Sequence, residues 1–347
     1  MNIKVTIYDV AREAGVGIGT VSRVLNNHPS VTPETRKLVK DVLVRLNYQP
    51  HTYAQRLAKR HSETISAIIP FFSTYFFVEV LRGVQDKISQ TGYDLVLYGV
   101  NDPQQVDSYI IRALDRGRVD GILFFSMQLP DHIVPRLRET ATPIVLVDSS
   151  SPDFDSISVA NAEGAYVATN HLIELGYESV GMIGANPTSN PAAQRLAGFR
   201  RAIESHNITF DESIVRRGTS SRLDGFNREA GYQAMTEFLE DGSEMPKAFF
   251  VSSDVQAIGA LDALNEHGLE VPKDVALVGF DDIELARHVR LTTMRQPMYQ
   301  MGALAVERLL ARMGDPALEI LHTTFSPTLI IRESCGAILR SRITSGK

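Results

Sequence analysis

Two short helical patterns separated by a glycine near the N-terminus constrain this chain more than any other feature. Ala11 lies four residues before Gly15 and ten before Val21. This spacing offers a small residue where two helices cross, a glycine that accepts positive φ in the turn, and a branched apolar anchor in the second helix. Thr6 and Asp9 predict the cap of the first helix. The pattern predicts a helix-turn-helix, which places its second helix in the major groove of DNA.

Apolar positions indicate that three helices enclose one small core. We expect the first two helices to pack through Val10, Ala11, Ala14, Val21, Val24 and Leu25. A third helix is expected to follow the cap Thr32, with Pro33 at its first position. Its apolar stripe consists of Leu38, Val39, Val42, Leu43 and Leu46.

Charge separates this region from the rest of the chain. Residues 1–61 hold ten Lys and Arg against four acidic residues, a net charge of +6, whereas residues 62–347 hold 25 basic and 37 acidic residues, a net charge of −12. A basic segment attached to an acidic body is typical of a protein in which one part meets phosphate.

Composition excludes several other classes. With 44% hydrophobic and 22% charged residues, the chain is typical of a soluble protein of two or three domains. No signal peptide and no membrane span are expected, and a single cysteine, Cys335, permits neither an internal disulfide nor a cysteine-based zinc site. Cys335 is expected to be a buried structural thiol in a cytoplasmic protein.

No enzyme motif is found. The glycines at 15, 17 and 19 resemble a dinucleotide loop only superficially, since no strand precedes them and no suitable acidic residue follows. The nucleophile-elbow, zinc-protease and phosphate-loop patterns are absent from the sequence. We therefore expect no catalytic residue, no metal and no cofactor.

From residue 65 onward, short apolar runs alternate with amphipathic helical patterns. The expected strands are 65–70, 94–100, 121–126, 144–148, 180–184, 248–252 and 275–280. The expected helices are 78–91, 105–116, 131–139, 164–175, 193–206, 229–240, 254–267 and 299–312. Such alternation is typical of parallel sheets covered on both faces. Because these strands and helices are too many for one sheet, two α/β lobes are expected.

At this point the chain resembles the LacI (lactose/purine repressor) family of bacterial transcription regulators, essentially from end to end. The segments that carry the resemblance are TIYDVAREAGVGIGTVSRVLN (6–26), VTPETRKLVKDVLVRLNYQPHTYAQRLA (31–58), NHLIELGY (170–177), RLAGFR (195–200), SSDVQAIGALDAL (252–264), LVGFDDIELA (277–286) and RQP (295–297). The first two are highly specific together, and the later ones follow in the order of the family.

The resemblance implies an N-terminal all-α helix-turn-helix head with a hinge helix, joined to an α/β core of two parallel-sheet lobes like type I periplasmic binding proteins. The boundaries that we expect are 1–48 for the head, 49–61 for the hinge, 62–161 plus 292–323 for the first lobe, 162–291 plus 324–340 for the second lobe, and 341–347 for a tail.

The resemblance also implies which residues face DNA bases. Ile18 and Gly19 stand at the base-facing positions, where Ile18 offers only apolar contact and Gly19 lets the backbone approach. Direct hydrogen-bond readout is therefore expected to be poor there. Arg23 is the candidate for a bidentate contact to guanine, with a phosphate contact as the alternative.

Other positions of the head are expected to contact phosphate. These positions are Tyr8, Thr20, Ser22 and Asn26. Gly17 departs from the serine that is common in the family, which removes a hydroxyl cap and a possible phosphate contact.

In the hinge, the resemblance implies that Leu57 is wedged into a central step of the minor groove, with Ala54 allowing close approach. The alternative is that Leu57 packs on the core. Leu57→Ala is expected to lose operator affinity and DNA bending while non-specific binding persists.

For the core, the resemblance implies a small-molecule site between the lobes. Arg195 and Asp254 match the arginine and aspartate that contact the effector, and Phe226 matches an aromatic position on the same wall. Within the aromatic segment 71–77, Tyr75 and Phe76 are expected to face the ligand and the others to be core. Asp148 faces the cleft or caps a loop. Asp281 and Asp282 are expected to form a structural loop next to the cleft rather than an acid/base pair.

The function implied is a DNA-binding repressor whose affinity for a pseudo-palindromic double-stranded operator is controlled by a sugar in the cleft. A homodimer is expected because half-sites on one face of DNA lie about one helical turn apart. The alternative is a global carbon-catabolite regulator driven by a phosphocarrier protein rather than by a bound sugar. The presence of both Arg195 and Asp254 favours a working pocket.

Overall fold

The computed structural model describes residues 5–48, 62–70, 74–100, 105–114, 119–187, 189–220, 222–242 and 244–338. The chain divides into two compact units, residues 1–62 and 63–347, each of which is described by itself. The predictions for Ala54, Leu57 and the tail 341–347 lie outside the described residues.

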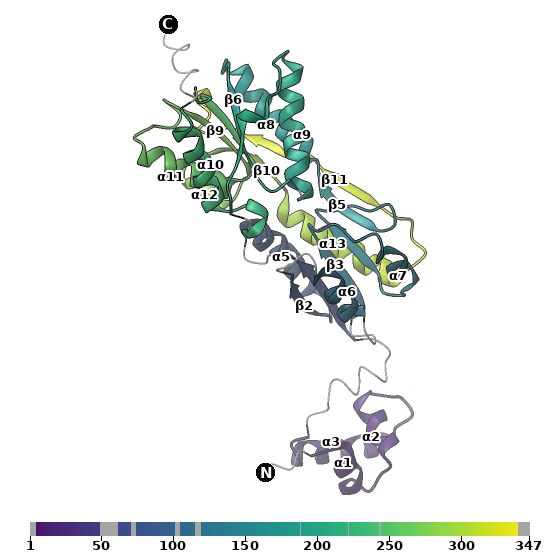
Figure 1. Ribbon diagram of the computed structural model, residues 1–347. Coiled ribbons are helices and arrows are strands. Elements are labelled where there is room, and N and C mark those ends of the chain that lie inside the picture. The colour runs from purple at the N-terminus through teal and green to yellow at the C-terminus, as the bar shows by residue number, and fades with distance from the viewer. Residues whose placement is uncertain are drawn as a thin grey trace. The chain divides into compact units, whose positions relative to one another are not determined.

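The first unit contains a helix-turn-helix followed by a third helix (Figure 1). The three helices are α1 (Ile7–Glu13), α2 (Ile18–Leu25) and α3 (Pro33–Arg45). The carboxylate of Asp9 accepts hydrogen bonds from the backbone N–H of Thr6 at 3.0 Å and from its hydroxyl at 2.7 Å. Gly15 has φ +62°, as the turn requires. Gly17 precedes α2 and provides no side-chain cap.

The core of this unit follows the predicted pattern with one exception. The buried apolar residues are Val10, Ala11, Ala14, Val21, Val24, Val39 and Val42. Leu38 is 48% exposed, so its prediction as part of the buried stripe was wrong. Three short helices thus enclose a valine-rich centre that fixes the angle between α1 and α2.

The second unit contains two six-stranded sheets. The first has the order β11-β5-β4-β3-β1-β2 and consists of His322–Phe325, Asp155–Val159, Ile144–Val147, Gly121–Phe125, Thr64–Ile69 and Asp94–Gly99. The second has the order β12-β10-β9-β8-β6-β7 and consists of Thr328–Ile330, Thr292–Arg295, Ala276–Asp281, Ala248–Val251, Val180–Gly184 and Val215–Arg217. All of these pairings are parallel except β10 with β12.

Helices cover both faces of each sheet, as expected for parallel sheets (Figure 1). In the first lobe they are α5 (Tyr75–Ile88) with α13 (Met298–Gly314) on one face and α6 (Val106–Leu114) with α7 (Val134–Glu139) on the other. In the second lobe they are α8 (Asn161–Glu174) with α9 (Asn190–Ser205), and α10 (Arg228–Glu240) with α11 (Asp254–Glu266). A short helix, α12 (Glu284–His288), follows β9.

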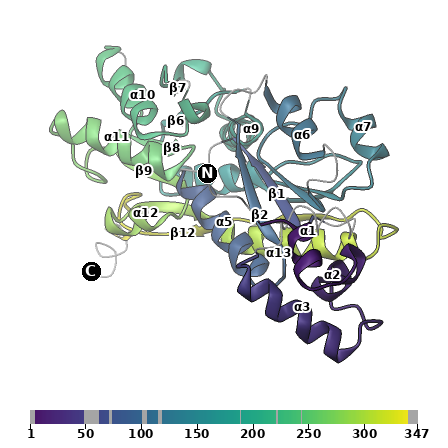
Figure 2. The same cartoon turned by 90° about the horizontal axis from the view of Figure 1, so that it is seen from below.

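Helices α5 and α13 lie side by side although they are far apart in the sequence (Figure 2). Glycines at the contact make this possible. A Cβ atom added to Gly83 would lie 2.0 Å from the carbonyl oxygen of Tyr299, and one added to Gly302 would lie 2.0 Å from that of Val80. Helix α5, whose first turn holds Tyr75, Phe76 and Phe77, is thereby fixed against α13, which follows the second crossing between lobes.

The structure corrects the predicted boundary between the lobes. β10 pairs with β9 in the second sheet, so residues 292–295 belong to the second lobe and not to the first. The chain therefore crosses after Arg295 rather than near residue 291, and it returns after β11, which ends at Phe325. The sequence of β10, TTMR, has three polar residues among four and therefore lacks the apolar run that predicts a buried strand.

Candidate functional site

A cavity lies between the two lobes, at the carboxyl ends of their strands. The first lobe contributes Pro70, Thr74, Tyr75, Phe76, Phe77, Ser126 and Asp148 to its lining. The second lobe contributes Ser189, Pro191, Arg195, Asp224, Phe226, Ser253, Val255 and Asp281. The empty space between these residues, part of which is open to solvent, measures about 650 Å³. This is the place where α/β sheets bind ligands.

The first turn of α5 forms an aromatic part of the wall. This helix begins at Tyr75, three residues before the start that the sequence predicted, because the hydroxyl of Thr74 caps it by accepting from the N–H of Phe77. Tyr75 is 45% exposed, whereas Phe77 is buried in the first lobe and also lines the cavity. The predicted positions Tyr75 and Phe76 therefore lie on a helix rather than in a loop.

Arg195, on α9, is the buried cation of this cavity. Its Nε donates to Oδ1 of Asn161 at 2.9 Å, and its Nη1 donates to the carbonyl oxygen of Ser252 at 2.5 Å. The ring of Phe280 packs against the guanidinium, with 3.8 Å between Cζ and the ring centroid, and the ring of Phe226 lies at 5.5 Å. Among the described residues no hydrogen-bond partner exists for Nη2, which leaves donors for a ligand in the cavity.

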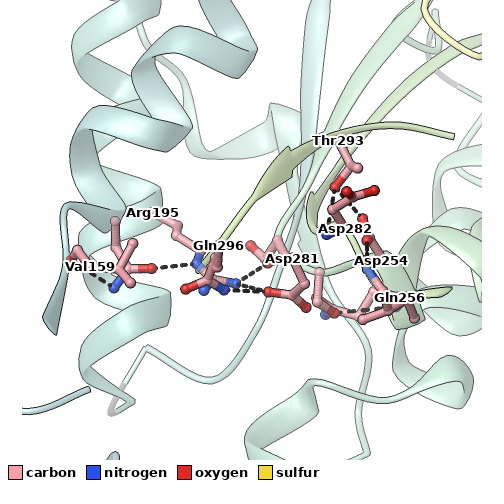
Figure 3. Close-up of polar contacts among 12 residues, drawn as sticks. Val159, Arg195, Asp254, Gln256, Asp281, Asp282, Thr293 and Gln296 are labelled. Carbon is pink, nitrogen blue, oxygen red and sulfur yellow. Dashed lines mark hydrogen bonds and ion pairs between the residues drawn. The ribbon is translucent and has the colours of Figure 1, made fainter. Parts of the chain in front are cut away.

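Asp281, at the end of β9, faces Arg195 in the cavity. Its Oδ1 lies 3.7 Å from Nη1 of Arg195 and accepts from Nε2 of Gln296 at 2.6 Å, as Figure 3 shows. Burial raises the pKa of Asp281 to about 6, against the opposing attraction of Arg195. The backbone of Asp281 has φ +124°, an uncommon conformation for a residue with a side chain.

Asp148 follows β4 and approaches the same cation from the first lobe. It has φ +55°, and its Oδ2 accepts from the hydroxyl of Ser126 at 2.8 Å. Burial raises the pKa of Asp148, although Ser126 and Arg195 lower it. Of the two alternatives for this residue, the structure thus favours the cleft over a loop cap.

Asp254 is fixed by contacts within the second lobe. It starts α11, and its carboxylate accepts from the hydroxyl of Thr293 at 2.6 Å and from the N–H of Ile283 at 3.0 Å. Figure 3 shows it beside Gln256, on the side of Asp281 away from Arg195. Burial raises the pKa of Asp254 well above its usual value. Asp254 is not among the residues that line the cavity, whereas its neighbour Ser253 is, so the role of Asp254 as an effector contact stays a prediction.

Asp281 and Asp282 differ sharply although they are adjacent. Asp282 is not part of the cavity lining, and its carboxylate pairs with two arginines, at 2.6 Å from Nε of Arg295 and 2.5 Å from Nη2 of Arg332. The sequence predicted a structural role for both aspartates. Of the two, only Asp282 lies outside the cavity lining and has such a role. The hydrogen bonds from Gln296 to Asp281 and from Arg295 to Asp282 together hold the end of β9 to the segment that crosses between the lobes.

The cavity thus brings together five of the six predicted effector residues: Tyr75, Phe76, Asp148, Arg195 and Phe226. Sequence reasoning missed Asp281 and Asp224, which also line it. Asp281 could have been found from its position at the carboxyl end of an apolar strand. Asp224 lies on a short 3-10 turn, Arg222–Gly225, which no apolar or helical pattern predicts.

In the first unit, the start of α2 is exposed. Ile18 is 41% exposed, and Gly19 and Arg23 are exposed beside it. The side chain of Arg23 has no partner among the described residues, whereas those of Arg12 and Arg45 pair with Asp9 and Glu13. Of the predicted phosphate contacts, Tyr8 and Asn26 are exposed and Thr20 and Ser22 are half-buried. Arg23 is therefore available to a partner of opposite charge.

No group of three or more His, Cys, Asp or Glu side chains that could hold a metal ion occurs among the described residues. Within the same part of the chain, every helix is too short or too polar to span a membrane.

Comparisons with known proteins agree with both units. Residues 6–51 match the family described as bacterial regulatory proteins, lacI family, and residues 169–335 match the periplasmic binding protein-like domain. The chain is 32% identical over 324 residues to catabolite control protein A of Priestia megaterium, across 91% of this chain and 95% of that relative.

Solved structures agree as well. A complex of the transcriptional regulator CelR with cellobiose has 29% identity and a TM-score of 0.69, covering 95% of this chain and 99% of that one. The lac repressor dimer bound to operator and the anti-inducer ONPF has 28% identity and a TM-score of 0.80, with the same coverage. The chain belongs to the LacI family and is a DNA-binding transcription regulator whose operator affinity is controlled by a small-molecule effector.

Proposed function

We propose that the protein represses transcription as a homodimer on a pseudo-palindromic operator and that a sugar bound in the cavity between the lobes changes its affinity for that operator. The observation that carries the proposal is the buried Arg195 in an aromatic-walled cavity, whose Nη2 has no hydrogen-bond partner among the described residues. Sugar sites combine planar hydrogen-bonding groups for vicinal hydroxyls with an aromatic face for the ring. A protein that binds a chromosomal operator acts in the cytoplasm, and we propose binding alone, without catalysis.

Within this proposal, the residues that line the cavity have distinct roles. Arg195 donates to ligand hydroxyls, Asp148 and Asp281 accept from them, and Phe226 with Tyr75 and Phe76 covers the apolar face of the ring. Because Asp281 is bonded to Gln296 in the crossing segment, ligand binding there acts directly on the connection between the lobes. If the ligand lowers the affinity for the operator by a given factor, thermodynamic linkage requires that the operator lowers the affinity for the ligand by the same factor.

In the head, we propose that Arg23 reads a guanine while Ile18 and Gly19 contribute close apolar and backbone contact. Operator sequences are first selected from random duplexes with the full-length protein. Arg23→Ala is then expected to cost about 1–3 kcal/mol on the selected operator and to relax one base position. A uniform loss on selected and random DNA would instead assign Arg23 to phosphate. Leu57→Ala tests the proposed wedge in the same assay, with DNA bending as its readout.

Dimerisation is supported by apolar side chains on an edge of the first lobe. β2 is the last strand of the first sheet, and its residues Val96 and Leu97 are 37% and 44% exposed, with Val78 of α5 at 50%. Exposed apolar side chains on an unpaired edge mark an interaction surface. Leu97→Lys is expected to shift the protein toward monomer in sedimentation equilibrium and to weaken operator binding, while Val44→Lys, at another exposed apolar position, leaves the dimer intact.

The effector is tested by a thermal-shift screen of sugars, followed by operator-binding assays with each ligand that raises the unfolding temperature. We expect at least one sugar to stabilise the protein and to change its operator affinity, and Arg195→Leu to abolish both effects. No stabilisation by any small molecule, together with a shift produced by a phosphocarrier protein, would favour the protein-driven alternative.

A further inference from the structure

The cavity holds a third carboxylate, that of Asp224, which no contact in the described structure accounts for. Asp224 lines the cavity and is half-buried, yet it has neither a hydrogen-bond nor an ion-pair partner for its side chain among the described residues. Burial alone raises the pKa of Asp224. An ionised group that loses water without gaining a partner destabilises the fold, so it is usually found where a ligand supplies the partner.

The backbone around Asp224 is held in a demanding conformation. Asp224 has φ +52° and the following Gly225 has φ +81°. The carbonyl oxygen of Asp224 accepts from the N–H of Asn186 at 2.8 Å, which fixes the turn against the end of β6. Two successive left-handed residues, anchored in this way, project one carboxylate and then Phe226 to the cavity.

The charges around the cavity are unbalanced. Three carboxylates line it, those of Asp148, Asp224 and Asp281, whereas the guanidinium of Arg195 is the single cation among the described lining residues. Carboxylates accept hydrogen bonds and donate none when ionised. Such a lining is complementary to a ligand that offers many donors and carries no negative charge.

We propose that Asp224 is a specificity-determining residue of the cavity, where it accepts a hydroxyl of an uncharged, hydroxyl-rich sugar and, with Asp148 and Asp281, excludes phosphorylated and carboxylated sugars. This inference rests on the proposed function, since it assigns the chemical class of the effector of the same cavity. A phosphate group brings further acceptors and two negative charges to a lining that already has an excess of both.

Calorimetry on the full-length protein tests the inference with matched pairs of ligands. The probes are glucose, galactose, ribose and fructose, each beside its terminal phosphate monoester, together with cellobiose. The free sugar of the best pair is expected to bind at least about 100-fold more tightly than its phosphate, because like charges placed together cost several kcal/mol. Tighter binding of the phosphorylated form by the wild-type protein would overturn the inference but leave the proposed function standing.

The variant Asp224→Asn isolates the residue. It is expected to weaken binding of the free sugar about 10-fold and to narrow the difference in affinity between sugar and phosphate about 10-fold. The unfolding temperature is expected to stay unchanged or to rise, because an unpaired, half-buried charge is removed. A purely structural Asp224 would instead lower the unfolding temperature and leave the two affinities in their original ratio. Glu178→Gln removes the same charge from an exposed site outside the cavity and is expected to change neither the ligand affinities nor the unfolding temperature.

The remaining outcomes are also decisive. Unchanged affinities in Asp224→Asn, with wild-type preference for the free sugar, would assign specificity to Asp148 and Asp281 and remove Asp224 from it. If no sugar binds in either form and operator affinity responds to none, the proposed effector class fails and this inference fails with it. The two failures are thus distinguished by whether the phosphate esters bind.

Discussion

Two buried groups of charges in the core are built in opposite ways. Asp155, in the first lobe, has a 1% exposed side chain and is surrounded by Arg308 and Arg312, which approach its oxygens to 2.8 and 2.7 Å, and by the N–H of Leu321 at 2.8 Å. Around Arg195 the ratio of cations to carboxylates is reversed, since Asp148, Asp254 and Asp281 all lie near one guanidinium.

The difference appears in the direction of the pKa shifts. Although burial alone would raise the pKa of Asp155, Arg312, the N–H of Leu321 and Arg308 hold it below its usual value. Burial prevails at Asp148, Asp254 and Asp281, whose pKa values are all raised. The first group stabilises a loop and an edge strand, and the second leaves acceptors that a ligand can satisfy.

The largest expected effect comes from breaking the balanced group. Asp155→Asn leaves Arg308 and Arg312 buried without a counter-charge and is expected to lower the free energy of unfolding by about 3–5 kcal/mol, which chemical denaturation followed by circular dichroism measures. Asp153→Asn removes a neighbouring carboxylate that pairs with the exposed Arg138 and is expected to cost less than about 1 kcal/mol. Equal losses in the two variants would show that the arginines find other partners.

A pH dependence of opposite sign is expected from the unbalanced group. Because the pKa of Asp281 is about 6 in the folded protein and about 4 in the unfolded chain, its contribution to stability is greatest at low pH and declines as the pH rises from about 4 to about 6. Between pH 7.5 and pH 5, the wild type is expected to gain about 1.4 kcal/mol relative to Asp281→Asn.

Denaturation of both proteins at the two pH values measures this difference. Asp155→Asn serves as the control, since the carboxylate of Asp155 is ionised at both values and its contribution stays constant. A constant difference between wild type and Asp281→Asn would mean that Asp281 is ionised throughout and that Arg195 compensates it fully.

Local sequence pattern predicted the central strands of both sheets but missed most strands toward their edges. Apolar runs and helical spacing predicted the strands β1, β2, β3, β4, β6, β8 and β9, because burial of apolar side chains depends on local pattern. β5, β7, β10, β11 and β12 escaped, since they are short or polar and lie toward the edges of their sheets or at the crossings between lobes.

For the cavity, the kinds of residue that line it are easier to predict than the direction in which each side chain points. Of the residues predicted to contact the effector, Arg195, Phe226 and Asp148 line the cavity and Asp254 does not, whereas Asp281, which was not predicted, does. The two aspartates differ in which way the backbone directs the carboxylate, and this depends on contacts to Thr293 and Gln296 that lie far away in sequence. Periodicity carries no information about such contacts.

The smallest expected effect is that of Arg295, one of the two arginines that pair with Asp282 next to the unbalanced group. Arg332 is 16% exposed and also donates to the carbonyl oxygen of Leu291, whereas Arg295 is 48% exposed. Arg332→Met is therefore expected to lower the free energy of unfolding by about 1–3 kcal/mol and Arg295→Met by at most about 1 kcal/mol, because water screens the exposed pair. Denaturation in low and high salt checks this order, since only the Arg295 pair is expected to weaken with salt. A larger loss in Arg295→Met would mean that the bond between residues 282 and 295, at the crossing between the lobes, contributes more to the fold than its exposure indicates.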